Sequence, residues 1–338
     1  MAFILATATG CQRSPETIQA TYFVLGTEVS IELGGMTEAD ARASLAKSQR
    51  LLQHIHRQWH AWEPGMLTTL NAAFREGQCL TIPAPLREVL KQAKNAEQLS
   101  GGLFNAAAGS LVKAWGFHTS EYPLTSAPPT ETALQELLNQ QPSMADVDLE
   151  SACVASRNSA VSIDLGGIGK GAAVDQVITL LESQGARFGL VNAGGDLRGF
   201  GTKPAPWRIA IRNPLDSSPL ALLEIRGDES VFTSGSYARY GQHQGQRYAH
   251  ILDPRSGKPA MSLTSATVIA TTGTLADAGA TALMVAGPQN AASVARSMGL
   301  GFWLIIEPDG CITINAPLAS RLRYPAAPPA CLNVLEER

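Results

Sequence analysis

The stretch from Asp164 to Gly171 constrains this chain most, because it joins a predicted strand directly to a predicted helix. The β-type run at residues 160–163 ends at Asp164, and four glycines and Lys170 follow before an amphipathic run begins. Glycine adopts positive φ without a steric penalty and lets another backbone or a ligand approach closely. A helix that starts here presents free N–H groups and the positive end of its dipole, to which Lys170 adds a full charge. The stretch therefore suits an anion such as a phosphate group.

Two standard phosphate-binding motifs are excluded by the spacing within this stretch. A P-loop requires Ser or Thr after its Gly-Lys pair, whereas Gly171 follows Lys170. The dinucleotide motif G-x-G-x-x-G is absent, because Gly167, Gly169 and Gly171 alternate and residue 172 is Ala. A tight strand-to-helix turn without a ligand explains the glycines equally well, so the loop alone leaves both interpretations open.

The composition is that of a globular chain with few charges. Hydrophobic residues make up 45% of the 338 residues and charged residues 16%, which fits one large domain or two closely packed ones. The net charge is −3 and no basic block is present, so nucleic-acid binding is disfavoured. No apolar run reaches the roughly 18 residues that a membrane-spanning helix requires.

Residues 1–21 are interpreted as the remnant of a lipoprotein signal followed by a flexible N-terminus. Small residues precede Cys11, as they precede the acylated cysteine of a bacterial lipobox. The basic start and the longer apolar core of a complete signal are missing, so an ordinary N-terminus with a chance cysteine is the alternative. We favour acylation at Cys11 because of this lipobox-like pattern, and the several acyl chains of a lipoprotein would anchor the protein firmly to a membrane.

The remaining cysteines are Cys79, Cys153, Cys311 and Cys331. None forms a C-x-x-C pair, so neither a zinc site nor a thioredoxin-type site is indicated. Their wide spacing does not show whether they pair, and we expect mostly buried thiols.

Apolar periodicity predicts interleaved helices and strands. The expected helices cover residues 41–63, 86–99, 131–139, 169–184, 274–286 and 290–298, with a short one within 103–117. The expected strands cover residues 22–33, 79–82, 160–163, 187–192, 207–212, 220–226, 229–233, 247–252, 263–270, 302–307 and 311–315. Several consecutive strands are close enough for hairpins, which favours a mixed α/β (α+β) fold over a doubly wound parallel sheet. The proline-rich residues 317–338 predict an irregular C-terminal tail.

Asp277 and Thr281 lie four residues apart in an apolar predicted helix, so they share one face. Burying an unpaired carboxylate there would be costly, and a bound Mg²⁺ would offset that cost with its preference for oxygen ligands. On spacing alone, a helix-capping role for Asp277 near Thr274 is the stronger interpretation. His250 precedes a turn at Asp253, where it could act as a general base or be purely structural.

Eight stretches, in one consistent order over residues 22–315, resemble the ApbE family of flavin transferases (FAD:protein FMN transferases). They are Gly26-Thr27-Glu28; Trp62-Glu63-Pro64 with Leu70-Asn71; Gly102 to Asn105 with Val112 to Phe117; Asp164 to Gly171; Asn192 to Asp196; Thr233 to Tyr237 with Arg239-Tyr240; His250 to Pro254 with Gly257; and Leu275-Ala276-Asp277 with Ala280 to Leu283. No single stretch is decisive, whereas eight in order are specific.

The resemblance implies a T-fold-related architecture with mixed sheets and packed helices over residues 22–316. It also implies a bacterial periplasmic lipoprotein, because members of the family are typically of that kind. It implies that FAD is split at its pyrophosphate, that FMN passes through a phosphoester bond to a Ser or Thr hydroxyl of a target protein, and that AMP is released. That target would be a membrane redox-complex subunit or a periplasmic flavoprotein. By position, the resemblance implies that the FAD site would comprise Leu25, Trp62, Leu103, Phe104, Asn105, Asp164, Lys170 and Ile251. It also implies that Asp277, Thr281 and the backbone carbonyl of Gly167 would bind Mg²⁺, and that His250 would be the base for the attacking hydroxyl.

Three positions depart from the usual family residues. Leu25 replaces a methionine of similar size, and Trp62 replaces a tyrosine but still offers a ring that can stack on flavin or adenine. Asn105 replaces an aspartate and so removes a charge. Two other functions stay open: an FAD pyrophosphatase that uses water as acceptor, and a non-enzymatic FAD-binding lipoprotein. The presence of both Asp277 and Thr281 disfavours the second of these.

Overall fold

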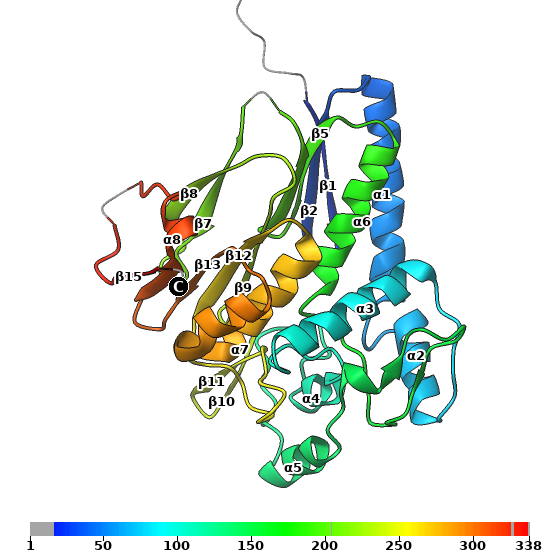
Figure 1. Cartoon of the computed structure of the whole chain (residues 1–338). Helices are drawn as coiled ribbons and strands as arrows, with labels where there is room; N and C mark the ends of the chain where they lie inside the picture. The colour runs from blue at the N-terminus through cyan, green and yellow to red at the C-terminus, as the bar shows by residue number, and fades with distance from the viewer. Residues whose placement is uncertain (1–16, 204, 326–327, 337–338) are drawn as a thin grey trace, which may run out of the picture.

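A nine-stranded sheet forms the centre of the computed structural model, which describes residues 17–203, 205–325 and 328–336 (Figure 1). Its strand order is β1-β2-β5-β6-β9-β12-β13-β14-β15. Neighbouring strands are antiparallel except β14 and β15, which are parallel. The mixed α/β fold predicted from the sequence is confirmed. Within the described ranges no helix is both long and apolar enough to cross a membrane, and Cys11 lies outside them.

The strands of the central sheet are β1 (Thr17–Val24), β2 (Thr27–Gly34), β5 (Phe188–Ala193), β6 (Asp196–Gly201), β9 (Ser230–Gly235), β12 (Ser265–Ala270), β13 (Phe302–Ile306), β14 (Ile312–Asn315) and β15 (Leu332–Leu335). Two-stranded sheets pair β3 (Val147–Asp148) with β4 (Ala155–Ser156), β7 (Trp207–Arg212) with β8 (Pro219–Ile225), and β10 (Tyr240–His243) with β11 (Gln246–Ala249). The helices are α1 (Glu38–Gln58), α2 (Met66–Arg75), α3 (Ala84–Leu99), α4 (Gly109–Ala114), α5 (Glu131–Asn139), α6 (Gly169–Ser183), α7 (Gly273–Ser297) and α8 (Ala316–Ala319), with a 3₁₀ turn at Met144–Asp146.

The central sheet is covered on both faces, which explains its apolar strands. Helices α1, α6 and α7 pack on one face and enclose the larger apolar core (Figure 1). The hairpin of β7 and β8, together with α8, encloses a second core against the other face. Strand β12 shows the result, because Val268 contributes to the first core and Ile269 to the second. A strand buried on both faces has a continuous apolar pattern instead of an alternating one.

The single strand expected at residues 22–33 is instead the hairpin of β1 and β2. Its two-residue turn is formed by Leu25 and Gly26, at φ 58° and 70°. Positive φ at both positions is the geometry of a type I′ turn, which usually carries Asn or Asp in the first position. A leucine there gives no turn signal, so the sequence pattern runs through it without a break.

Three other expectations about secondary structure are wrong. Helix α2 was not expected, and the strand at residues 79–82 is reduced to one bridge between Leu80 and Val154. The C-terminal tail contains α8 and the edge strand β15, so its described part is not irregular throughout. By contrast, the two helices predicted at 274–286 and 290–298 are confirmed: α7 consists of two helical segments separated by a kink at Gly287, whose backbone is not helical, just before Pro288.

The four cysteines expected as thiols form two disulfides, Cys79–Cys153 and Cys311–Cys331. The second one ties the segment before β15 to the start of β14, which is how proline-rich tail residues come to extend the sheet.

Removing Cys79–Cys153 by a double Ser substitution should destabilise the protein more than removing Cys311–Cys331. The bridges span 74 and 20 residues, so the chain-entropy model expects losses of about 4 and about 3 kcal/mol. Urea unfolding of the two double variants measures the difference. Equal midpoints, or the opposite order, would show that native-state strain and not loop length controls the effect.

Candidate active site

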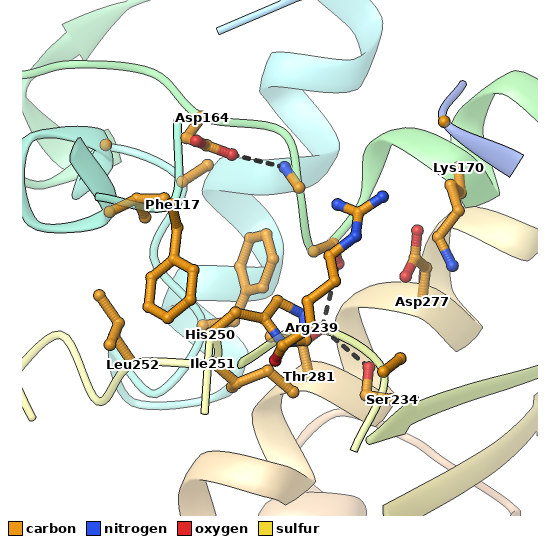
Figure 2. A pocket seen from close by; sticks show the side chains of 18 of the residues that line it. Phe117, Asp164, Lys170, Ser234, Arg239, His250, Ile251, Leu252, Asp277 and Thr281 are labelled. Atoms are coloured by element: carbon orange, nitrogen blue, oxygen red, sulfur yellow. Dashed lines mark hydrogen bonds between the residues drawn. The ribbon is translucent and has the colours of Figure 1, made fainter. Parts of the chain in front are cut away.

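One cavity of about 490 Å³ lies beside the glycine loop and the first half of α7. Its volume falls in the range of small-molecule sites, about 300–1,000 Å³. Figure 2 shows Lys170 and Asp277 facing one another at one end, with Phe117 and Asp164 at the other. The cavity brings together all twelve residues predicted for the site: Leu25, Trp62, Leu103, Phe104, Asn105, Asp164, Gly167, Lys170, His250, Ile251, Asp277 and Thr281.

Residues 160–163, before the glycine loop, were expected to form a strand, but they do not belong to a sheet. They make one parallel bridge, between Ser162 and Ala108, and the Asp164 N–H donates to the carbonyl of Ala106 at 2.8 Å. Asp164 then turns the chain, because its Oδ1 accepts from the Gly166 N–H at 2.7 Å. The loop is thus fixed against the wall of the cavity before α6 begins at Gly169.

Gly171 lets the first turn of α6 contact the start of α7 backbone to backbone. A Cβ at this position would lie 2.7 Å from the backbone nitrogen of Thr274 and closer still to the carbonyl of Gly273. The glycine is required for this crossing, which places the glycine loop against Asp277 and Thr281.

Gly171→Ala should therefore destabilise the protein by about 2–3 kcal/mol, since both neighbours are backbone and cannot rotate away. Thermal unfolding measures the loss, and Gly185→Ala is the matched control because a Cβ there meets no atom within 4 Å, although φ at Gly185 is +88°. A larger loss in the control variant would show that backbone conformation outweighs the helix crossing.

Asp277, Thr281 and Gly167 all line the cavity and carry oxygen atoms that can bind a metal ion. The Oγ1 of Thr281 lies 3.5 Å from the carbonyl oxygen of Gly167 and 3.2 Å from the Oγ of Ser234. Asp277, one turn earlier on α7, is only 4% exposed. A carboxylate, a hydroxyl and a carbonyl are the hard donors that Mg²⁺ prefers, so these residues fit the predicted ion. The described residues contain no cluster of three or more His, Cys, Asp or Glu side chains suited to a metal.

Asp277 does not cap its own helix, as the alternative interpretation required. Thr272 is the N-cap of α7, and Asp175 accepts from the N–H groups of Gly273 and Thr274 at 2.7 and 2.9 Å. Asp277 instead accepts from the N–H of Gly171 at 2.9 Å, which caps the first turn of α6. One oxygen of its carboxylate therefore has a structural partner.

The two charges at this end differ in exposure, because Asp277 is buried whereas the side chain of Lys170 is 34% exposed. Burial raises the pKa of Asp277, and the nearby Lys170 opposes that rise. Burial likewise lowers the pKa of Lys170, against the attraction of Asp277. Lys170 also forms an ion pair with Asp196. A cation bound beside Asp277 would interact strongly with its buried carboxylate, because the local dielectric constant there is lower than that of water.

The strand expected at 247–252 is shorter in the structure, where β11 ends at Ala249 and pairs with β10 in a hairpin. His250 therefore lies just after β11. Its Nδ1–H donates to the carbonyl of Arg239 at 2.9 Å, which leaves Nε2 without the proton (Figure 2). Burial, and then the positive charge of Arg239, lower the pKa of His250 from 6.5 to about 4. The imidazole is therefore neutral at physiological pH and able to accept a proton.

Sequence reasoning missed several polar residues of the site. His118 pairs with Asp164, Arg239 orients His250, and Asp196 accepts from Lys170 and from the N–H of Thr233. Asp196 and Arg239 belong to stretches of the family pattern, so the resemblance could have identified them as site residues. His118 lies 46 residues from its partner and belongs to none of those stretches, so no local pattern marked it.

A glycine turn at a helix start, an oxygen-lined corner and a neutral histidine together define a site for cleaving or transferring a phosphate-linked group. The family model described as the ApbE family matches residues 25–303, which is most of the chain. The chain therefore belongs to the ApbE family.

Relatives and solved structures agree with this assignment. The chain is 38% identical to an FAD:protein FMN transferase of Rhodobacter capsulatus over 90% of its length, although it spans only 58% of that longer protein. It is 32% identical to one of Klebsiella pneumoniae, covering 87% of this chain and 85% of that protein. The crystal structure of the ApbE protein of Thermotoga maritima superimposes with a TM-score of 0.83 at 28% identity, covering 91% of this chain and all of that one. A flavin transferase ApbE from Vibrio cholerae gives 0.79 at 27%, covering 91% and 99%.

Proposed function

We propose that this chain is an Mg²⁺-dependent FAD:protein FMN transferase. It takes FAD as substrate and transfers FMN through a phosphoester bond to a Ser or Thr hydroxyl of a target protein, with release of AMP. The observation that carries the proposal is the convergence of all twelve predicted residues on one cavity, with oxygen donors at one end and a neutral histidine beside them. The names of the relatives support the same activity.

The residues of the cavity have three separate roles: metal binding, electrostatic stabilisation and acceptance of a proton. Asp277, Thr281 and the carbonyl of Gly167 would hold Mg²⁺, which supplies positive charge to the pyrophosphate oxygens and to the AMP leaving group. Lys170 and the N-terminus of α6 add electrostatic stabilisation at the same end. The Nε2 of His250 accepts the proton of the acceptor hydroxyl as its oxygen bonds to the FMN phosphorus. The bond between that phosphorus and the bridging oxygen breaks, and AMP leaves with the electron pair.

Location outside the cytoplasm is part of the proposal. Two disulfides form and persist in oxidising compartments and are rare in the cytosol, which favours the bacterial periplasm. A lipid anchor at Cys11 would hold the enzyme at the membrane, near a flavin-accepting subunit of a redox complex or a periplasmic flavoprotein. Mass spectrometry of Cys11 in the protein purified from membranes tests the anchor.

A transfer assay tests the activity and separates the alternatives. The protein is incubated with FAD, Mg²⁺ and a candidate acceptor domain, and flavin fluorescence is followed on the acceptor band. A fluorescent acceptor supports transfer. Free FMN and AMP without a labelled acceptor indicate an FAD pyrophosphatase, and intact FAD indicates a binding protein without catalytic activity.

A further inference from the structure

The indole of Trp62 contacts two imidazoles. Trp62 lies in the loop between α1 and α2, and His118 stacks on it with ring centroids 5.1 Å apart and planes 19° from parallel. His60 meets the same indole edge-on at 4.1 Å. His60 is itself fixed, since its Nδ1 accepts from the Glu63 N–H at 3.1 Å. The indole is therefore oriented although its loop is not part of a helix or a strand.

His118 also holds the glycine loop. Its Nε2–H donates to Oδ2 of Asp164 at 3.0 Å, and the two side chains are only 11% and 14% exposed. The other carboxylate oxygen, Oδ1, accepts from the Gly166 N–H. Both oxygens of Asp164 are thus engaged, so the rotation of this carboxylate depends on His118 as well as on the loop.

The position of His118 separates it from groups that contact the substrate. Trp62 and Asp164 both line the cavity, whereas His118 contacts both of them but does not line it. His118 joins the side chain of Trp62, which follows α1, to the glycine loop, which begins about a hundred residues later in the sequence and contains Gly167. One imidazole therefore couples the aromatic end of the cavity to the loop that carries a predicted Mg²⁺ donor.

We infer that His118 is a positioning residue that presets the ring of Trp62 and the carboxylate of Asp164 for binding FAD. A ring that already lies in its binding orientation loses less side-chain freedom when the ligand stacks on it. The inference rests on the proposed function, because FAD is taken as the ligand. It assigns His118 no proton transfer and no contact with the reacting phosphorus.

The two contacts of His118 can be removed separately. His118→Phe keeps a ring against Trp62 but cannot donate to Asp164, whereas His118→Gln keeps a donor but no aromatic ring. His118→Ala removes both contacts. We expect His118→Ala to raise KM for FAD about tenfold or more, with kcat within about twofold of the parent, which is the effect of losing one hydrogen bond to a carboxylate. Phe and Gln should each restore part of the loss.

A double-mutant cycle distinguishes positioning from general destabilisation. If His118 acts partly through Trp62, the effect of His118→Ala on the Kd for FAD should be smaller in a Trp62→Ala background. His54→Ala is the matched control, since His54 is exposed on α1, and it should leave Kd and KM unchanged. Equilibrium dialysis with FAD alone gives Kd without turnover, and thermal unfolding confirms that each variant folds.

The outcomes separate this inference from the proposed function. If the parent protein neither binds nor cleaves FAD, the proposed function is wrong. If the parent binds FAD and His118→Ala binds it equally well, His118 has no positioning role. Additive effects of His118→Ala and Trp62→Ala would also overturn the inference, as would a loss confined to kcat.

Discussion

Asp277→Asn should reduce FMN transfer about a thousandfold while the protein stays folded. Asparagine retains an oxygen that can accept from the N–H of Gly171, so the first turn of α6 keeps its cap. It lacks the negative charge that, in the proposed site, holds Mg²⁺ with Thr281 and the Gly167 carbonyl. Because burial raises the pKa of Asp277, the buried charge destabilises the metal-free fold, and its removal should not lower the melting temperature. Initial rates at saturating FAD over a range of Mg²⁺ concentrations measure the effect.

A matched carboxylate distinguishes loss of the ion from loss of charge in general. Asp175 also lies between α6 and α7, where it accepts from the start of α7 and pairs with Arg198 at 2.5 Å. Asp175→Asn should lower stability but leave the Mg²⁺ dependence of transfer unchanged. If Asp277→Asn kept more than a tenth of the activity with the Mg²⁺ dependence of the parent, the assignment of Asp277 to the ion would be wrong.

The parts of the fold that could be predicted are those in which a local pattern dominates. Helices α5 and α6 and strand β7 lie close to their predicted bounds, because periodicity and capping residues mark them. The β1–β2 turn could not be predicted, since Leu25 adopts a positive φ that leucine rarely takes. Strand β15 was missed for a different reason. It pairs with β14 and is tied by Cys311–Cys331, and both are contacts between segments that are separate in the sequence.

In the candidate site, too, relations within one helix could be predicted from the sequence, whereas contacts between distant segments could not. Asp277 and Thr281 could be related from their spacing, because one helix carries both. Placing the Gly167 carbonyl next to Thr281 required the close crossing of α6 and α7 at Gly171, a tertiary contact that the sequence does not show. The family pattern supplied that relation in advance for the predicted residues. It could not supply His118, whose contacts with Trp62 and Asp164 exist only once three distant segments have packed together.

His250→Gln should lower transfer to an acceptor by about 10² to 10⁴-fold, the usual contribution of a general base, while the Kd for FAD changes little. Glutamine retains an N–H that can donate toward the carbonyl of Arg239, but it cannot accept a proton at neutral pH. Cleavage of FAD with a strong nucleophile in place of the hydroxyl should depend less on the base. An equal loss with every acceptor, together with weaker FAD binding, would indicate a structural role.

The pH profile of the parent enzyme tests the same assignment without a substitution. His250 acts in its neutral form, and burial with the charge of Arg239 lowers its pKa to about 4, so the base stays deprotonated as the pH falls from 8 to 5. The kcat/KM for transfer should therefore lose nothing to protonation of His250 in that window, and should fall about tenfold per pH unit below about 4. A histidine at its ordinary pKa would begin to lose activity near pH 6.5. Circular dichroism at each pH separates titration from acid unfolding. An acid limb near 6.5 that disappears in His250→Gln would show that the imidazole is the base but that its pKa is not lowered in the folded protein.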